Sequence, residues 1–146
     1  MKRRTPFFSL MAASLLFSAS AFSQTANEGK VEHTKGNKAA AVIELPYPEE
    51  EVADMLSDAM AARGVKGDKA KGFVVYRNVR LHDNDQDLSD LHFKVERKSR
   101  KEKDITNVYL IIGKPSENIG LRSAVDYHKI EEAKSYLNTM VPKMEA

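Results

Sequence analysis

Three runs of strand-forming residues follow one another between residues 72 and 113, with only short polar segments between them. The runs are GFVVYRNVRL (72–81), LHFKVERK (91–98) and TNVYLIIG (106–113). A parallel crossover needs about a dozen residues or more, whereas strands joined by shorter connections pair in antiparallel fashion. The spacing of these runs therefore predicts an antiparallel sheet.

The first two runs alternate between two sets of residues, which is typical of strands with one buried face. The set expected to be buried consists of Phe73, Val75, Val79, Leu81, Leu91, Phe93 and Val95. The set expected to face solvent consists of Val74, Tyr76, Asn78, Arg80, His92, Lys94 and Glu96. Arg77 falls on the apolar face, so we expect the first strand to bend or break near Asn78. The third run is apolar throughout and predicts a central or fully covered strand.

Two amphipathic helices are predicted before and after these strands. In residues 47–64, apolar side chains recur every three or four positions, and Gly64 suits a helix end. Pro48 and the three glutamates after it suit a helix start. The second helix is expected to start at Ser123 with a capping box and to end at Pro142. Its expected buried stripe is Tyr127, Ile130, Leu137 and Val141.

A short apolar run, AAVIEL (40–45), precedes the first helix and predicts one further strand. The expected order is therefore β-α-β-β-β-α, with a fourth strand after the first helix if the long run breaks. This order predicts an α+β fold, in which an antiparallel sheet carries two helices packed on one face. The opposite face of such a sheet is expected to be open to solvent.

The N-terminus has the pattern of a secretory signal peptide. A basic MKRR precedes the apolar residues 7–22, and cleavage is predicted after Ser23. The alternative is an uncleaved membrane anchor, but a spanning helix needs about 20 apolar residues, and serines interrupt this segment. We therefore divide the chain into a signal peptide (1–23), a flexible lead-in (24–38) and a single α+β domain (39–146). The mature protein is expected to be periplasmic or secreted, without a stable membrane anchor.

Composition and charge exclude several classes of function. The chain has a formal net charge of +2, and loss of Lys2, Arg3 and Arg4 with the signal peptide lowers it to −1. The basic balance is therefore no argument for nucleic-acid binding. The chain has no cysteine, which excludes thiol nucleophiles and cysteine metal sites. Because the common hydrolase, phosphate-loop and zinc-protease motifs are also missing, we expect a non-enzymatic protein without a cofactor.

The segments KGFVVYRNV, LHFKVERKSRKEKD and NVYLIIGKPSEN, with AKSYLN in the last helix, resemble a group of small exported bacterial domains of uncharacterised function. The resemblance covers roughly residues 40–140 and rests on core and turn residues. Such domains are similar to the TATA-binding-protein-like class of α+β folds. Because that class hosts unrelated functions, the resemblance implies a fold and no catalytic residues.

The predicted open sheet face is the first candidate binding site. It would gather Tyr76, Arg80, His92 and Lys94, and we expect a protein or an envelope polymer as the partner. The simpler interpretation is the solvated face of an ordinary half-buried sheet. The basic segment KVERKSRKEKD (94–104) is interpreted as a solvated edge that resists aggregation, with binding of an anionic polymer or lipid headgroup as the alternative.

The alternative candidate site is a divalent-cation site formed by Asp83, Asp85 and Asp87, which alternate between the first two strand runs. A calcium loop of the EF-hand type also needs a glycine and a bidentate acid at fixed later positions, and neither is present. Two weaker hypotheses stay open, a looser oxygen site in this segment and a zinc site of His82, His92 and one aspartate. Aspartates are also common in ordinary turns, where they bond nearby backbone groups.

Overall fold

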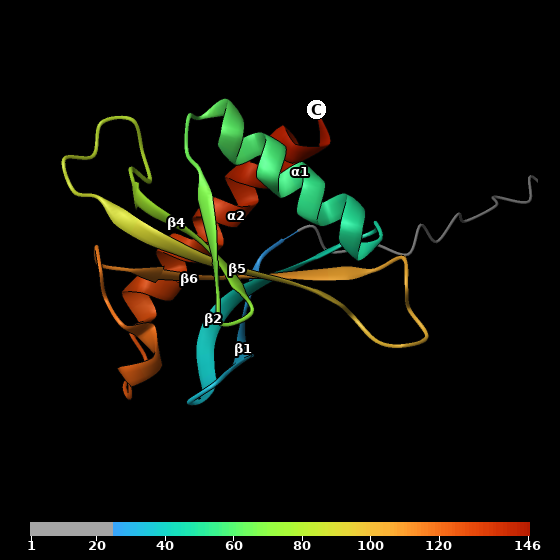
Figure 1. Ribbon diagram of the computed structural model, residues 1–146, viewed down its shortest axis with the longest axis horizontal. Coiled ribbons are helices and arrows are strands. Elements are labelled where there is room, and N and C mark those ends of the chain that lie inside the picture. Colours follow the sequence, from blue (N-terminus) through green and yellow to red (C-terminus); the bar gives the residue numbers. More distant parts are fainter. Residues whose placement is uncertain (1–24) are drawn as a thin grey trace, which may run out of the picture.

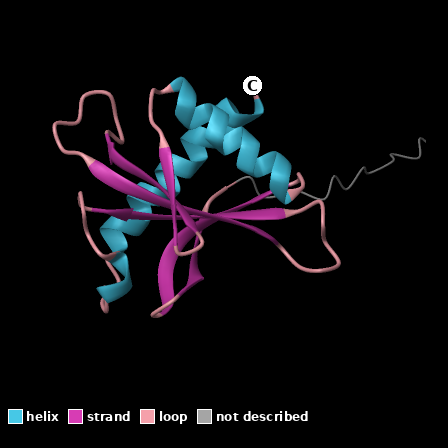
Figure 2. Cartoon of the chain, viewed as in Figure 1, coloured by secondary structure: helices cyan, strands magenta, loops and turns pink. Residues whose placement is uncertain are grey.

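The computed structural model describes residues 25–146 as one antiparallel sheet with two helices on one of its faces (Figure 1). The strands are β1 (Asn27–His33), β2 (Gly36–Leu45), β3 (Gly67–Ala70), β4 (Phe73–Val79), β5 (Ser89–Arg97) and β6 (Thr106–Gly113). The helices are α1 (Glu49–Ala62) and α2 (Tyr127–Glu145), with a short 3-10 turn η1 (Ile119–Leu121) before α2. The predicted α+β class and antiparallel sheet are thus confirmed (Figure 2).

The strands lie in the order β1-β2-β6-β5-β4-β3, so β6 and β5 are the central strands. All neighbouring pairs are antiparallel. The predicted signal peptide, residues 1–23, lies outside the described residues. Neither helix of residues 25–146 has the length and the apolar character needed to span a bilayer.

The prediction of a flexible lead-in over residues 24–38 is wrong for its described part, because these residues contain β1 and the start of β2. The two strands pair from Asn27 opposite Val42 to His33 opposite Gly36. Gly36 has a φ of +99°, which suits the tight turn between them. β1 is an edge strand, and its residues are mostly polar. Backbone hydrogen bonds largely hold an edge strand in its sheet, and they do not require a repeating pattern of apolar side chains in the sequence.

Helix α1 forms where the sequence predicts it. The acids at Glu49, Glu50 and Glu51 occupy its first turn, where they stabilise the positive end of the helix dipole. The chain leaves the helix through Gly64, which has a φ of +76° and donates its N–H to the Ala61 carbonyl. The buried face consists of Val52, Leu56 and Met60.

Helix α2 differs from its prediction at both ends. It begins after Asp126, whose carboxylate accepts a hydrogen bond from the Lys129 N–H, and not at Ser123. Tyr127 is therefore in the first turn and exposed, not buried as predicted. Pro142 lies inside the helix, which continues to Glu145. The predicted stop there is wrong, and the helix tolerates a proline three residues before its end.

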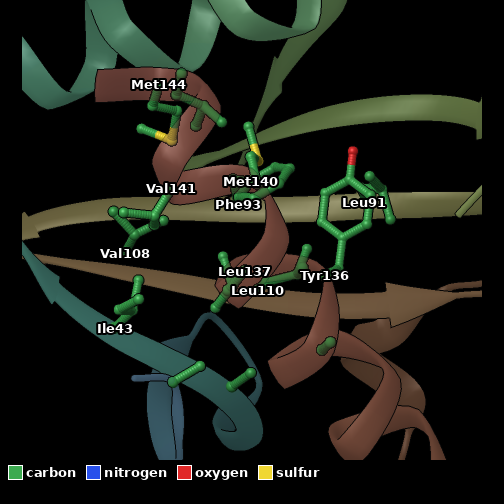
Figure 3. Close-up of a cluster of buried hydrophobic side chains, with 14 of the residues drawn as sticks. Ile43, Leu91, Phe93, Val108, Leu110, Tyr136, Leu137, Met140, Val141 and Met144 are labelled. Carbon is green, nitrogen blue, oxygen red and sulfur yellow. The ribbon is translucent and has the colours of Figure 1, made fainter. Parts of the chain in front are cut away.

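The main core lies between the helices and one face of the sheet. Figure 3 shows Leu137, Met140 and Val141 of α2 packed onto side chains of the central strands. The strand residues of this layer that the figure labels are Ile43, Leu91, Phe93, Val108 and Leu110. Complete burial of one such side chain contributes about 1.5–3 kcal/mol, so this layer is the principal source of stability.

The face opposite the helices is also closed, which corrects the prediction of an open sheet face. Six buried residues form a second cluster there: Val31, Ala40, Phe73, Val75, Ile111 and Ile119. Strand twist coils the sheet, and two diagonally opposite corners, the end of β1 and the start of β4, come together. As a result the His33 ring on β1 lies 5.6 Å from the Phe73 ring on β4, centroid to centroid. Lys94 on β5 donates a hydrogen bond to the Glu32 carbonyl oxygen on β1, at 3.1 Å.

The face of β4 predicted to pack under the helices lies on the other side of the sheet, and the face predicted to be open packs under the helices. Phe73 and Val75 belong to the second cluster, while Tyr76 belongs to the main core under the helices. The predicted bend near Asn78 is confirmed, since this residue has a φ of +57° and the β4–β5 register shifts there. Because of this irregularity, Val79 lies in the main core together with Tyr76.

Candidate functional site

A pocket of about 520 Å³ opens where the end of α1 and the second half of α2 meet the loop after β4 (the helix pocket). Its apolar lining includes Met60 on α1, Met140 on α2 and Leu81 on the loop. Its polar lining residues are Arg63, His82, Asp83, Asn84, Tyr136, Thr139 and Lys143. Small-molecule sites typically measure about 300–1,000 Å³ and combine an apolar lining with a few polar groups, as this pocket does.

Arg63 and Tyr136 form the polar centre of the helix pocket. The Arg63 guanidinium donates a hydrogen bond to the Tyr136 hydroxyl and a second, at 2.8 Å, to the Arg80 carbonyl oxygen. Its central carbon also lies 5.7 Å from the centroid of the Tyr136 ring. The Tyr136 hydroxyl in turn donates to the Met60 sulfur at 3.6 Å. These contacts tie α1, α2 and the loop together around one tyrosine.

The electrostatics of the helix pocket keep Tyr136 in its neutral form. Burial raises the pKa of the Tyr136 phenol, although the positive charge and the hydrogen bond of Arg63 act in the opposite direction. The phenol therefore stays protonated at neutral pH. Arg63 directly follows α1, where a cation stabilises the negative end of the helix dipole. The pocket thus offers an apolar lining beside a guanidinium and a phenol that are already held in place.

The aspartate segment shapes the loop at the mouth of the helix pocket. Asp85 accepts a hydrogen bond from the His82 N–H at 3.2 Å, and its own N–H donates to the His82 carbonyl oxygen at 3.0 Å. Asp83 lines the pocket, whereas Asp87 does not. Within residues 25–146, no group of three or more His, Asp or Glu side chains is gathered as metal ligands would be. The divalent-cation hypothesis therefore stays a prediction.

The residues predicted to form a binding face are not brought together. Tyr76 is buried under the helices, and His92 is buried on the other side of the sheet. Lys94 is half-buried and forms an ion pair with Glu96 at 3.1 Å. Arg80 is exposed beyond the end of β4, where its carbonyl oxygen binds Arg63. The predicted platform of these four side chains does not form.

His92 belongs instead to a buried polar cluster at the start of β5. Its Nε2 atom has no hydrogen-bond partner among the described residues. Burial lowers the pKa of His92, and Arg77 and Arg122 act in the same direction, while Asp90 and Glu117 oppose them. The neutral imidazole is therefore the favoured form in the folded protein.

A wider groove of about 810 Å³ runs between α1 and the β3–β4 hairpin. Val74 and Val95, two of its lining residues, are half-buried and pack against the main core. Its described lining residues include no hydrogen-bonded polar pair comparable to Arg63 and Tyr136. The helix pocket is therefore the better candidate for a specific ligand.

Sequence reasoning missed the residues of the helix pocket. Tyr136 lies three residues after the buried Ala133, so the helical period could have placed it on the inner face of α2. Nothing in the sequence marks Arg63 as a pocket residue, because the helix dipole alone explains a cation directly after a helix. Nothing in the chain indicates that the two residues meet, since they lie 73 positions apart.

Comparisons with known proteins give this chain no relative. No protein-family model, no curated protein and no solved structure matches it. The resemblance to small exported domains of the TATA-binding-protein-like class therefore stays a prediction.

Proposed function

We propose that this chain is an exported, non-enzymatic binding domain that holds a small, largely apolar ligand in the helix pocket. Export is inferred from the signal-peptide pattern of residues 1–23. The observation that carries the binding proposal is the pocket of about 520 Å³ with the fixed Arg63–Tyr136 pair beside Met60 and Met140.

The chemistry of the lining favours a ligand with an apolar body and one polar group. The methionine side chains are unbranched and polarizable, so they adapt to apolar molecules of different shape. Arg63 retains N–H groups beyond the two bonds it makes, and Lys143 adds further donors. A carbonyl, carboxylate or sulfonate oxygen on the ligand could accept hydrogen bonds from these donors.

The proposal is tested by blocking the helix pocket with a large side chain. Thr139 is exposed and lines the pocket, and its hydroxyl bonds only to the Ser135 carbonyl one turn earlier. Thr139→Trp should therefore fill the pocket without disturbing the main core. Ser135→Trp, at an exposed position of α2 outside the pocket lining, is the matched control.

The probe is anilinonaphthalene sulfonate, which joins an aromatic body to one anionic group. We expect saturable binding at a single site, weakened about tenfold or more by Thr139→Trp and unchanged by Ser135→Trp. Fluorescence is excited in the dye's own band, because the natural chain has no tryptophan and the variants do. Equal affinity of both variants, with both folded by circular dichroism, would contradict the proposal.

A further inference from the structure

The segment between β6 and α2 exposes an unusual amount of apolar surface. Leu121, Val125 and Tyr127 are 67%, 46% and 66% exposed, and Leu88 at 39% is the other large apolar side chain exposed among the described residues. Single exposed apolar residues are normal on protein surfaces. Three of them lie within residues 121–127. Exposed apolar residues that gather in one region mark interaction sites.

This apolar segment lies against the tip of the β1–β2 hairpin. The Lys38 ammonium donates a hydrogen bond to the Arg122 carbonyl oxygen at 2.8 Å. Gly120 packs on the His33 ring so closely that a Cβ atom there would lie 2.8 Å from its Cε1. Figure 1 shows the β1–β2 turn (blue) and the chain before α2 (orange) at the same lower end of the molecule.

Lysines surround the same hairpin tip. His33 is acted on by four ammonium groups, which come from the β1–β2 turn, β2, the β3–β4 turn and β5: Lys35, Lys38, Lys71 and Lys94. Burial and these four charges all lower the pKa of His33. Lys35 and Lys71 are exposed, and neither forms a salt bridge within the described residues.

Three acids of this region already have partners within the chain. Glu117 binds the Arg122 guanidinium, and Glu96 pairs with Lys94. Asp126 caps α2, while Glu32 is exposed on β1. We define the basic-apolar end by its exposed apolar residues Leu121, Val125 and Tyr127 and its lysines Lys35, Lys38, Lys71 and Lys94.

We propose that the basic-apolar end is a peripheral contact site for an anionic lipid bilayer. Lysines near an anionic membrane are attracted to its surface potential, and exposed leucine, valine and tyrosine side chains gain by entering the headgroup region. A water-soluble polyanion would use the lysines but would leave the apolar side chains in water. The helix pocket lies toward the other end of α2, so the two sites are separate.

The proposal is tested by co-sedimentation with vesicles of phosphatidylglycerol and phosphatidylcholine. The chain used begins at Gln24, because the apolar residues 7–22 would themselves bind lipid. Every described strand and helix, and both apolar clusters, lie within residues 25–146 and are retained in this chain. Circular dichroism and thermal unfolding confirm that each variant is folded.

Two pairs of substitutions separate the lysines from the apolar side chains. Lys35→Glu with Lys71→Glu should weaken vesicle binding about tenfold or more. The reason is that each lysine near an anionic surface raises the binding constant about fivefold. Leu121→Ser with Val125→Ser should also weaken it. Lys101→Glu with Lys103→Glu tests the basic segment 94–104 as the alternative lipid contact, and Leu88→Ser on the β4–β5 loop is the apolar control. Both should bind like the parent chain.

Three results would overturn the proposal: no binding to anionic vesicles, equal loss in the test and control variants, or dependence on the lysines alone. In the last case, dextran sulfate should bind the parent and the Leu121→Ser, Val125→Ser variant equally, and the site would be one for soluble polyanions. Loss in both test pairs, with neutral vesicles bound weakly, supports the lipid surface. Thr139→Trp should not change vesicle binding, which keeps this result independent of the ligand proposal.

Discussion

At the scale of single residues, Asp90 is a buried carboxylate that binds two separate backbone segments. Its side chain is 1% exposed, and it accepts hydrogen bonds from the Asn78 N–H at 3.0 Å and from the Ser116 N–H at 2.9 Å. The Arg77 guanidinium lies 3.4 Å from the same carboxylate. Asn78 and Ser116 both have positive φ, at +57° and +63°. One carboxylate thus holds two unfavourable backbone conformations, the bulge of β4 and the turn after β6.

Asp90→Ala should therefore lower the free energy of unfolding by about 2–4 kcal/mol, because two backbone N–H groups lose their acceptor. Asp90→Asn keeps an acceptor oxygen and should lose less. Asp87→Ala, at an exposed position of the preceding loop, is the control and should change stability by less than about 0.5 kcal/mol. Urea unfolding of the three variants measures these differences, and a loss at Asp90→Ala no larger than at Asp87→Ala would refute this role.

At the scale of elements, α2 joins the basic-apolar end to the helix pocket. Its first turn carries the exposed Tyr127 of the basic-apolar end, and its second half lines the helix pocket with Tyr136 and Met140. Between them the helix is anchored by Leu137, which is buried against the sheet (Figure 3). The packing of α2 on β2 and β6 thus fixes both ends at once.

Leu137→Ala should cost about 2–5 kcal/mol of unfolding free energy, since it removes a fully buried side chain and leaves a cavity. Ser135→Ala on the exposed side of α2 should be neutral or slightly stabilising, because alanine has the higher helix propensity. Thermal and urea unfolding of both variants give the comparison. A loss below about 0.5 kcal/mol for Leu137→Ala would mean that α2 is not packed as described.

At the scale of the whole molecule, the fold buries two histidines that lie on polar positions in the sequence. His33 and His92 both have pKa values below the ordinary 6.5, with burial as the largest cause in each case. Around His33 the other cause is a set of lysines, and around His92 it is Arg77 and Arg122 against Asp90 and Glu117. The folded state therefore binds fewer protons than the unfolded state just below pH 6.5.

Stability should accordingly be full above about pH 6.5 and fall as the pH drops from there toward the lowered pKa values of the folded state. Urea unfolding at intervals between about pH 5 and 8 measures the slope. The double variant His33→Gln, His92→Gln cannot titrate at these positions and should show a flatter profile in this window. If its profile keeps the slope of the parent chain, carboxylates and not these histidines control the response.

The sequence by itself determined the elements whose signal is local. The three- and four-residue spacing placed α1, and the unbroken apolar run placed β6 at the centre of the sheet. The position of Arg77 on an otherwise apolar strand face predicted the bend at Asn78. In each case the information lies within a few neighbouring residues, because helix period, turn conformation and strand alternation are properties of a short stretch of chain.

Only the tertiary structure decided which faces meet. Alternation shows that Phe73 and Val75 share a face, but not that this face lies opposite the helices, and coiling of the sheet closed both faces of β4. Pairing with β2 places the polar β1 in the sheet, and the fold buries Tyr76 and His92, so the predicted platform does not form. The helix pocket joins Arg63 to Tyr136, and no local pattern encodes such a pair. Long-range contacts of this kind follow from how whole elements pack, so the helix pocket exists only in the folded chain.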